Sequence, residues 1–296
     1  MDVNNKAPIG VFDSGVGGLT VAREIMRQLP NERIVYFGDT ARVPYGSKSK
    51  NNIIKYSRQN VRFLLSKNVK AIVVACNTAS ALALDEIKDE IEIPVIGVVR
   101  PGAQTAVNST KNKRIGVIGT DATIKSELYT EYIHELDKDI TVIGKACPLF
   151  CPLVEEGMLH DEVTDEMARR YLSGLQTEDI DTLILGCTHY PLLRSTVGRI
   201  MGENVNLINP AYETAMSLKS LLEDNNLLNN EEDTSDVKLY VKKNDSNSSD
   251  TVNEDNDVKI KYEFYVSDAA GKFQTFANSI LPFDIEVINQ INIEEY

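Results

Sequence analysis

Short runs of aliphatic and β-branched residues alternate with longer amphipathic stretches along most of the chain. The short runs have the composition of buried parallel strands, and the longer stretches carry apolar residues at the spacing of one helix face. The pattern predicts strands at residues 9–12, 33–37, 93–99, 114–118, 140–143 and 205–208, and two more that lead to Cys76 and Cys187. It predicts helices after the first strand, at residues 50–66, 79–90, 122–136 and 162–175, and from Pro191 onward. Asn77 or Thr78 is available to cap the helix at 79–90, and residues 100–102 (Arg-Pro-Gly) are expected to break the pattern.

This alternation implies parallel sheets covered by helices on both faces. It also repeats, because Ile9-Gly-Val11 matches Ile115-Gly-Val117 and the strand before Cys76 matches the strand before Cys187 at a similar offset. The sequence therefore predicts an α/β protein with two doubly wound, flavodoxin-like domains related by a pseudo-two-fold axis. The expected domains are residues 1–99 with 208–296, and residues 100–207. Ligands bind open α/β sheets at the carboxyl ends of the strands, so we expect the active site between the domains.

Residues 243–257 depart from the pattern, because Val252 is the only apolar residue among them. Such a composition cannot bury enough surface to offset its ordering entropy. We expect a flexible, hairpin-type excursion between the apolar segments at 237–241 and 258–266.

The composition narrows the functional classes. The 296 residues carry a formal net charge of −13 with a pI near 4.8, which argues against a nucleic-acid partner or an anionic membrane surface. No apolar run approaches the length of a membrane span, and the N-terminus lacks the organisation of a signal peptide. The expected location is the cytoplasm.

Two of the four cysteines are candidates for chemistry. Cys76 and Cys187 fall where a strand ends and a helix begins, and the N-terminal end of a helix favours an anion, so we expect both thiols to be shifted towards thiolate. Two thiols presented in this way suggest a pair of opposed acid/base groups. Cys147 and Cys151 form a C-x3-C pair without a second such pair, so we expect ordinary packing residues, no disulfide framework and no metal site.

Polar residues accompany the first thiol. The Gly-rich turn after the first strand contains Asp13 and Ser14 and lacks the spacing of a Rossmann or P-loop motif. We expect its backbone amides and the Ser14 hydroxyl to point at a carboxylate, although Asp13 could also merely cap the following helix. The turn at Tyr45 and Gly46 could bring backbone and a Tyr hydroxyl to the same rim.

Other polar residues accompany the second thiol. His189 lies two residues after Cys187 and can hold it as thiolate or hand it a proton. Glu155 and Glu156 are expected at a strand-to-helix connection, where they are either a solvated pair or an auxiliary carboxylate of the cleft.

Five motifs together resemble the glutamate racemases of the aspartate/glutamate racemase family. They are Ile9-Gly-Val-Phe-Asp-Ser-Gly-Val-Gly-Gly18, Val43-Pro-Tyr-Gly46, Ala75-Cys-Asn-Thr-Ala-Ser80, Val154-Glu-Glu-Gly157 and Gly186-Cys-Thr-His-Tyr-Pro191. They occur in the family's order and cover nearly the whole chain apart from the stretch around 243–257.

The resemblance implies specific roles. Cys76 and Cys187 would be the acid/base catalysts, supported by Asp13 and His189, with Glu155, rather than Glu156, as a further carboxylate. The implied substrate-binding residues are Asp13, Ser14, Tyr45, Gly46, Asn77, Thr78, Thr120, Thr188 and His189. Cys187 would take the proton from L-glutamate while Cys76 donates to the other face, and the roles would swap for D-glutamate. The family needs no cofactor, commonly forms homodimers and supplies D-glutamate for peptidoglycan.

Three alternatives stay open from the sequence. An aspartate racemase of the same family would also use two cysteines, and only the pocket length would separate the substrates. A two-domain protein could close on an amino acid without turning it over. A thiol redox enzyme is a third possibility, although Cys76 and Cys187 lack a C-x-x-C arrangement.

Overall fold

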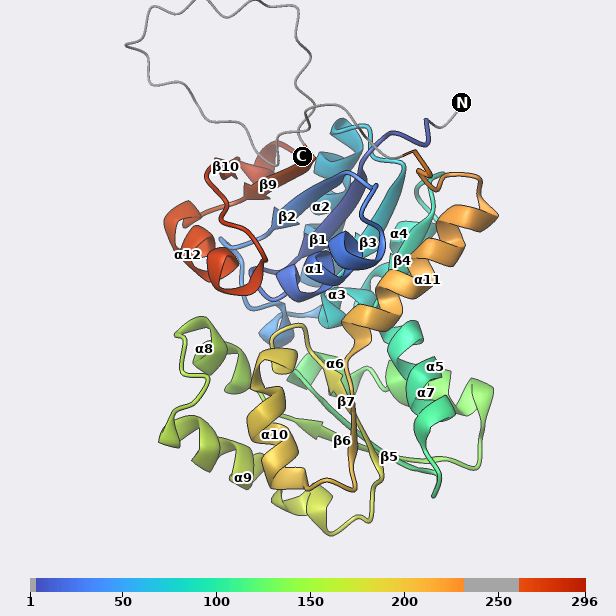
Figure 1. Ribbon diagram of the computed structural model, residues 1–296, viewed down its shortest axis with the longest axis vertical. Coiled ribbons are helices and arrows are strands. Elements are labelled where there is room, and N and C mark those ends of the chain that lie inside the picture. Colours follow the sequence, from blue (N-terminus) through green and yellow to red (C-terminus); the bar gives the residue numbers. More distant parts are fainter. Residues whose placement is uncertain (1–3, 232–260) are drawn as a thin grey trace, which may run out of the picture.

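The chain folds into two α/β units, each built on a parallel sheet, in a computed structural model that describes residues 4–231 and 261–296 (Figure 1). The excursion expected at 243–257 lies outside the described residues. None of the helices within the described ranges is long and apolar enough to cross a membrane.

The first unit is built on a six-stranded parallel sheet with the order β10-β9-β2-β1-β3-β4. Its strands are β1 (Ile9–Asp13), β2 (Ile34–Gly38), β3 (Ala71–Val74), β4 (Val95–Gly97), β9 (Tyr262–Val266) and β10 (Asn289–Gln290). Every residue of β1, β2 and β3 is buried, which explains their continuous apolar runs. Residues 261–296 return to the first sheet, where β9 pairs with β2 and β10 pairs with β9.

The second unit is built on a four-stranded parallel sheet with the order β6-β5-β7-β8. Its strands are β5 (Arg114–Gly119), β6 (Thr141–Ala146), β7 (Thr182–Gly186) and β8 (Asn206–Ile208). The order β2-β1-β3-β4 of the first sheet is thus repeated in the second, which is the flavodoxin-like order. The repeat seen in the sequence is a repeat of topology.

Helices cover both faces of each sheet (Figure 1). On the first sheet, one face packs against α1 (Leu19–Gln28), α11 (Pro210–Asp224) and α12 (Ala270–Ile280), and the other against α2 (Lys50–Ser66), α3 (Asn77–Leu82) and α4 (Leu84–Lys88). On the second sheet, one face packs against α8 (Phe150–Glu155), α9 (Glu162–Gln176) and α10 (Arg194–Met201), and the other against α5 (Val99–Ser109) and α7 (Leu128–Leu136). The remaining helices are α6 (Asp121–Lys125) and the 3-10 turns Tyr45–Ser47, Tyr190–Leu193 and Ile293–Glu295.

Three expectations about helices were wrong. The Arg-Pro-Gly segment at 100–102 does not break the pattern of helices and strands. It lies in the first turn of α5 (Val99–Ser109), where the missing N–H of Pro101 costs no hydrogen bond. The helix expected at 79–90 is divided into α3 and α4 at Ala83. The helix expected at 122–136 is interrupted at Glu127, which has a left-handed backbone with φ of 57°.

Candidate active site

The two candidate thiols occupy equivalent places in the two sheets. Cys76 follows β3 and Cys187 follows β7, and each of these strands is the third in the shared order. Asp13 ends β1 and Thr120 follows β5, so they are also equivalent. The carboxyl ends of the two sheets meet, because the Thr188 hydroxyl lies 3.4 Å from Oδ1 of Asp13.

Cys76 is itself the N-cap of α3. Its Sγ lies 3.5 Å from the amide of Ala79 and accepts that hydrogen bond. The expectation that Asn77 or Thr78 would cap this helix was therefore wrong. Asn77 instead accepts a hydrogen bond of 2.7 Å from the hydroxyl of Tyr129, which belongs to the second unit.

The Gly-rich turn after β1 binds a carboxylate, but it is the carboxylate of Asp13. The amides of Ser14, Gly15 and Gly18 donate to it, with Gly15 at 3.0 Å from Oδ2. The expectation that these amides face an external carboxylate is therefore not met by this geometry. Burial raises the pKa of Asp13, and the charge of His189 and the three amides oppose that rise. The Ser14 hydroxyl hydrogen-bonds the Cys76 thiol.

Cys187, His189 and Glu155 form a chain of contacts. His189 Nδ1 lies 3.7 Å from Cys187 Sγ, and its Nε2 lies 3.0 Å from Oε1 of Glu155. Glu155 is the last residue of α8 rather than part of a loop, whereas Glu156 points away and pairs with Lys272 at 2.8 Å. Of the two neighbouring glutamates, Glu155 is the one placed against the histidine.

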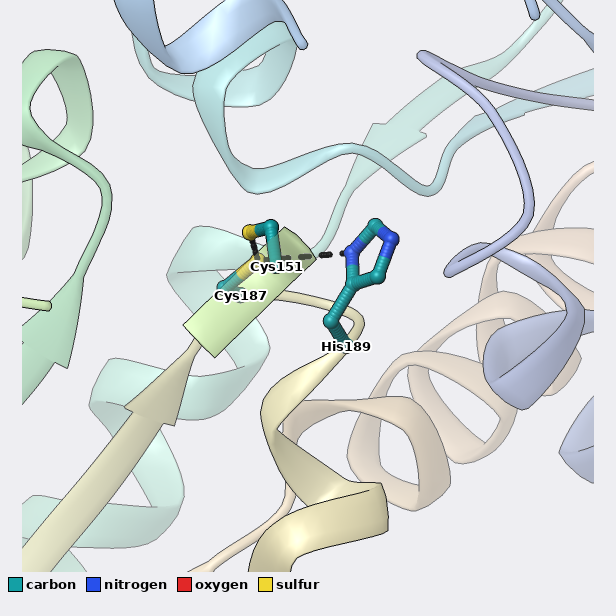
Figure 2. Close-up of side chains that lie close together, drawn as sticks. All are labelled: Cys151, Cys187 and His189. Carbon is teal, nitrogen blue, oxygen red and sulfur yellow. Dashed lines mark hydrogen bonds between the residues drawn. The ribbon is translucent and has the colours of Figure 1, made fainter. Parts of the chain in front are cut away.

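Cys151 also lies in this cluster, contrary to its expected role as an ordinary packing residue. Figure 2 shows its Sγ beside that of Cys187, at 3.5 Å. Cys147 is buried nearby, and its thiol contacts the Lys145 carbonyl at 3.7 Å. The two members of the C-x3-C pair therefore have different environments.

The thiols do not have the lowered pKa that their positions at helix N-termini suggested. Burial, followed by the charge of Asp13, raises the pKa of Cys76 to about 12. Contact with Cys151 and burial raise the pKa of Cys187 well above its usual value, and His189 works against that rise. Burial works to lower the pKa of His189, but its contacts with Cys187 and Glu155 raise it to about 10. Burial at Cys76, and the contact with Cys151 together with burial at Cys187, therefore outweigh the effect expected of a helix N-terminus.

Three threonine hydroxyls join the units on the Cys76 side of the site. Thr78 Oγ1 lies 3.0 Å from Thr120 Oγ1 and 3.2 Å from Thr123 Oγ1. The backbone of Gly46 lies directly on Thr120, since a Cβ at Gly46 would be 2.5 Å from the Thr120 Cβ. These contacts bring together Gly46, Thr78 and Thr120, three of the residues implied in substrate binding.

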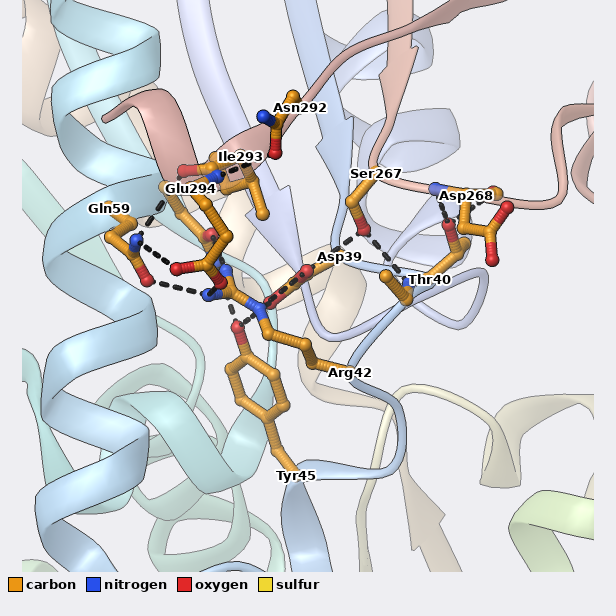
Figure 3. A network of polar contacts seen from close by, with 12 residues as sticks. Asp39, Thr40, Arg42, Tyr45, Gln59, Ser267, Asp268, Asn292, Ile293 and Glu294 are labelled. Atoms are coloured by element: carbon orange, nitrogen blue, oxygen red, sulfur yellow. Dashed lines mark hydrogen bonds and ion pairs between the residues drawn. The ribbon is translucent and has the colours of Figure 1, made fainter.

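Tyr45 is placed differently from the expectation. Its buried hydroxyl donates to Asp39 and accepts from Asn60 at 3.0 Å. Asp39 also accepts from Arg42 at 2.8 Å and from Ser267 at 2.9 Å, in the network that Figure 3 shows. The Tyr45 hydroxyl is thus committed to the interior of the first unit and does not reach the rim.

Similarity to known proteins agrees with this architecture. Residues 9–218 match the family described as Asp/Glu/Hydantoin racemase. The chain belongs to the Asp/Glu/Hydantoin racemase family. It is 50% identical to a glutamate racemase from Geobacter metallireducens over 74% of this chain and 82% of that protein. Among solved structures, a glutamate racemase isoform from Bacillus anthracis superposes with a TM-score of 0.85 at 38% identity, covering 97% of this chain and 98% of that one. One from Francisella tularensis, in complex with D-glutamate, has a TM-score of 0.84 at 37% identity and covers 99% of this chain and 100% of that chain.

In this member of the racemase family, sequence reasoning missed several residues around the thiols. Thr20 in α1 donates to the Thr188 carbonyl at 3.1 Å, and Tyr36 holds the Gly-rich turn through the Gly15 carbonyl at 2.9 Å. Cys151 had a usable signal, because it follows β6 and so lies at the same edge of the sheet as Cys187. Within the described ranges, Cys151, Cys187 and His189 form the group of side chains that could hold a metal ion.

Proposed function

We propose that the chain is a glutamate racemase that interconverts L- and D-glutamate by proton transfer at Cα between Cys76 and Cys187, without a cofactor. The observation that carries the proposal is the placement of two buried thiols at equivalent strand ends of two sheets whose carboxyl ends meet. Family membership supports the reaction class. The names of the curated relatives support glutamate, rather than aspartate, as the substrate.

Racemisation requires a base on one face of Cα and an acid on the other. A closed site of this kind excludes water, so the proton delivered to the product comes from a thiol. Because burial holds both thiols protonated, we propose that the substrate's ammonium group offsets the desolvation of the thiolate when it enters the site. Cys187 takes the proton from L-glutamate while Cys76 donates, and the roles swap for D-glutamate.

The neighbouring charges favour this assignment of starting states. His189 works to lower the pKa of Cys187 and therefore favours its thiolate, and Glu155 holds the imidazolium in place. Asp13 adds to burial in keeping Cys76 protonated. The positive charge of His189 beside Cys187 and the negative charge of Asp13 beside Cys76 therefore favour Cys187 as the base and Cys76 as the acid. Ser14, Gly46, Asn77, Thr78, Thr120 and Thr188 are the proposed substrate-binding groups. Tyr45 would act indirectly, because its anchored side chain belongs to the same 3-10 turn as Gly46.

The wider setting is also a proposal. Residues 1–99 with 208–296 would form one domain and residues 100–207 the other, because the two sheets draw their strands from these parts, apart from Ile208 at the end of β8. The resemblance supports a cytoplasmic homodimer that supplies D-glutamate for peptidoglycan.

The test replaces each thiol in turn. Cys76→Ala and Cys187→Ala are each expected to abolish net interconversion in both directions, measured by circular dichroism of the amino acid. Cys147→Ala removes a buried thiol that contacts the Lys145 carbonyl and is assigned no proton-transfer role, so it is the control and should retain activity. Near-full activity in either of the first two variants would refute the two-thiol mechanism. Faster turnover of L-aspartate than of L-glutamate by the unaltered protein would favour an aspartate racemase.

Solvent deuterium provides a second measurement. Product formed in D2O should carry deuterium at Cα from the first turnovers, while the remaining substrate exchanges little. Extensive exchange into unreacted substrate would indicate a single shared base instead.

A further inference from the structure

Two sulfur atoms and one imidazole nitrogen converge beside the second sheet. Cys151 Sγ lies 3.5 Å from Cys187 Sγ, which lies 3.7 Å from His189 Nδ1, and all three atoms are within 4.8 Å of one another (Figure 2). Tetrahedral zinc has Zn–S bonds of about 2.3 Å and Zn–N bonds of about 2.0 Å, so its ligand atoms are separated by about 3.8 Å for S···S and about 3.6 Å for S···N. The S···S separation is about 0.3 Å shorter and the S···N separation about 0.1 Å longer than these values, so small side-chain rotations would suffice for these two pairs.

The histidine is already oriented for such a role. Its Nε2 faces Oε1 of Glu155 at 3.0 Å, which turns Nδ1 towards the two sulfur atoms. A carboxylate behind a ligating imidazole is the usual support of a metal-bound histidine. Cys151 and Glu155 are four residues apart on α8 and therefore share one face of that helix. This single helix thus supplies both a thiol and the carboxylate that fixes the imidazole.

The charge balance also suits a divalent ion. All three side chains are buried, with 6% of Cys151, 6% of Cys187 and 3% of His189 exposed. Two thiolates and a neutral imidazole around a dication form a complex of zero net charge. Binding releases three protons, one from each thiol and one from the imidazolium of His189, as the two sulfur–metal bonds and the nitrogen–metal bond form.

We propose that Cys151, Cys187 and His189 form an inhibitory site for a thiophilic divalent cation of the zinc class. The three side chains provide three ligands, and the fourth position takes water or another oxygen donor. A metal ion on Cys187 withdraws that thiol from proton transfer, so occupancy stops racemisation. The inhibition, but not the binding, rests on the proposed function.

The experiment compares the reduced, metal-free protein with Cys151→Ala and with the matched control Cys147→Ala. Co2+ is titrated in, and its thiolate charge-transfer absorption reports binding without turnover. Zn2+ is then added to racemase assays, followed by EDTA. The unaltered protein and Cys147→Ala should give the absorption and lose activity, and EDTA should restore it.

Cys151→Ala should stay active without metal and become insensitive to Zn2+. Loss of an outer-shell partner typically lowers metal affinity by about 10- to 100-fold, and loss of the ligand Cys151 should lower the Co2+ affinity by at least as much. Cys151→Val is a second variant with a larger apolar side chain, in case the alanine leaves a disruptive cavity. Equal Zn2+ inhibition of both Cys151 variants and the unaltered protein, or absence of the Co2+ absorption, would overturn the proposal.

Two outcomes distinguish the metal site from the proposed racemase function and from a disulfide between Cys151 and Cys187. A protein that binds Co2+ through Cys151 but does not racemise glutamate would refute the proposed function and leave the metal site standing. Inactivation that is reversed by a thiol reductant but not by EDTA would mean that Cys151 and Cys187 form a disulfide, which would overturn the metal site.

Discussion

Gly17 lies directly against the second unit. A Cβ at this position would be 2.4 Å from Thr188 Oγ1 and 2.5 Å from His189 Nδ1. Both contacts belong to the segment that carries Cys187. Absence of a side chain at Gly17 is therefore a condition for bringing the Gly-rich turn against the second thiol.

Gly17→Ala should consequently impair activity more than folding. Displacing catalytic groups by about 1 Å can cost about 100-fold in rate, and we expect a loss of kcat/KM of that order. Gly174→Ala is the control, because it lies in α9 with open space around it and should stabilise the protein by about 0.5–1 kcal/mol. Steady-state kinetics and urea denaturation of both variants provide the comparison. An unchanged kcat/KM for Gly17→Ala would show that the units need not approach this closely during turnover.

Tyr45 distinguishes a structural role from a substrate contact. Tyr45→Phe should lower the free energy of unfolding by about 1–3 kcal/mol, because it leaves Asp39 and Asn60 short of a buried partner. KM should stay nearly unchanged. Tyr56→Phe removes a hydroxyl from the adjacent half-buried ring and should have little effect on either quantity. A large rise in KM with unchanged stability would mean that the Tyr45 hydroxyl reaches the substrate.

At the scale of single residues, the sequence located the thiols but could not predict their protonation. Cys76 and Cys187 were found because strand ends can be recognised from apolar runs followed by polar residues. Their raised pKa depends on how completely the opposite unit covers them, and on Cys151, which is distant in sequence from Cys187. The place of Cys151 after β6 indicates the shared sheet edge, but the residues around each thiol do not indicate how closely these distant segments pack.

At the scale of elements, strands were predictable where they are fully buried. The predicted runs 9–12 and 33–37 agree with β1 and β2 to within one residue at each end, the strand predicted before Cys76 is β3, and the order shared by the two sheets accounts for the repeat. Helices were less predictable, because their breaks arise from single backbone conformations such as the left-handed Glu127. A break was expected around Pro101 because proline disrupts the interior of a helix. Pro101 lies in the first turn of α5, where proline is tolerated, so the helix is not interrupted.

The start of β7 depends on a carboxylate that is hydrogen-bonded to a loop. Asp181 accepts from the Thr110 hydroxyl at 2.6 Å and from the amides of Lys111 and Asn112 at 2.6 and 2.8 Å. Burial works to raise its pKa, but these hydrogen bonds prevail and hold the pKa of Asp181 below the usual value of 3.8. The ionised carboxylate therefore fastens the loop before β5 to the strand that leads to Cys187.

Asp181 should make stability depend on pH. Because its folded pKa is depressed, its contribution is fully present above its unfolded pKa and is lost as pH falls through the folded pKa. Asp181→Asn should cost about 1–2 kcal/mol at neutral pH and should flatten the decline of stability on acidification, measured by urea denaturation. Asp139→Asn, at an exposed site, is the control. An acid decline as steep in Asp181→Asn as in the unaltered protein would contradict this assignment.

At the scale of the whole molecule, the two units are packed together on one side by shared side chains. Leu192 and Phe276 each contact both the α1–α11–α12 core and the α8–α9–α10 core. Lys272 on α12 pairs with Glu156 after α8 at 2.8 Å, which is a surface contact of small energetic weight. Because each unit contributes one thiol, the relative position of the units sets the distance between base and acid.

Because each unit contributes one thiol, a change beside one thiol should affect kcat differently in the two directions. His189 contacts Cys187 and favours its thiolate, which is the base for L-glutamate. His189→Asn should therefore lower kcat more in the L-to-D direction, by at least about tenfold more, which corresponds to about one pKa unit at the thiol. The control is His134→Asn. It removes the imidazole of His134 in α7, which is hydrogen-bonded to the carbonyl of Ile140.

The asymmetry must be read from kcat and KM separately. Free L- and D-glutamate have equal energies, so the ratio of the two kcat/KM values is fixed for every variant, and a fall in one kcat must be matched through KM. Progress curves started from each enantiomer, followed by circular dichroism, give both parameters. If His189→Asn lowers kcat by the same factor in both directions, the histidine serves the whole site, and its assignment to the thiol of the second unit is wrong.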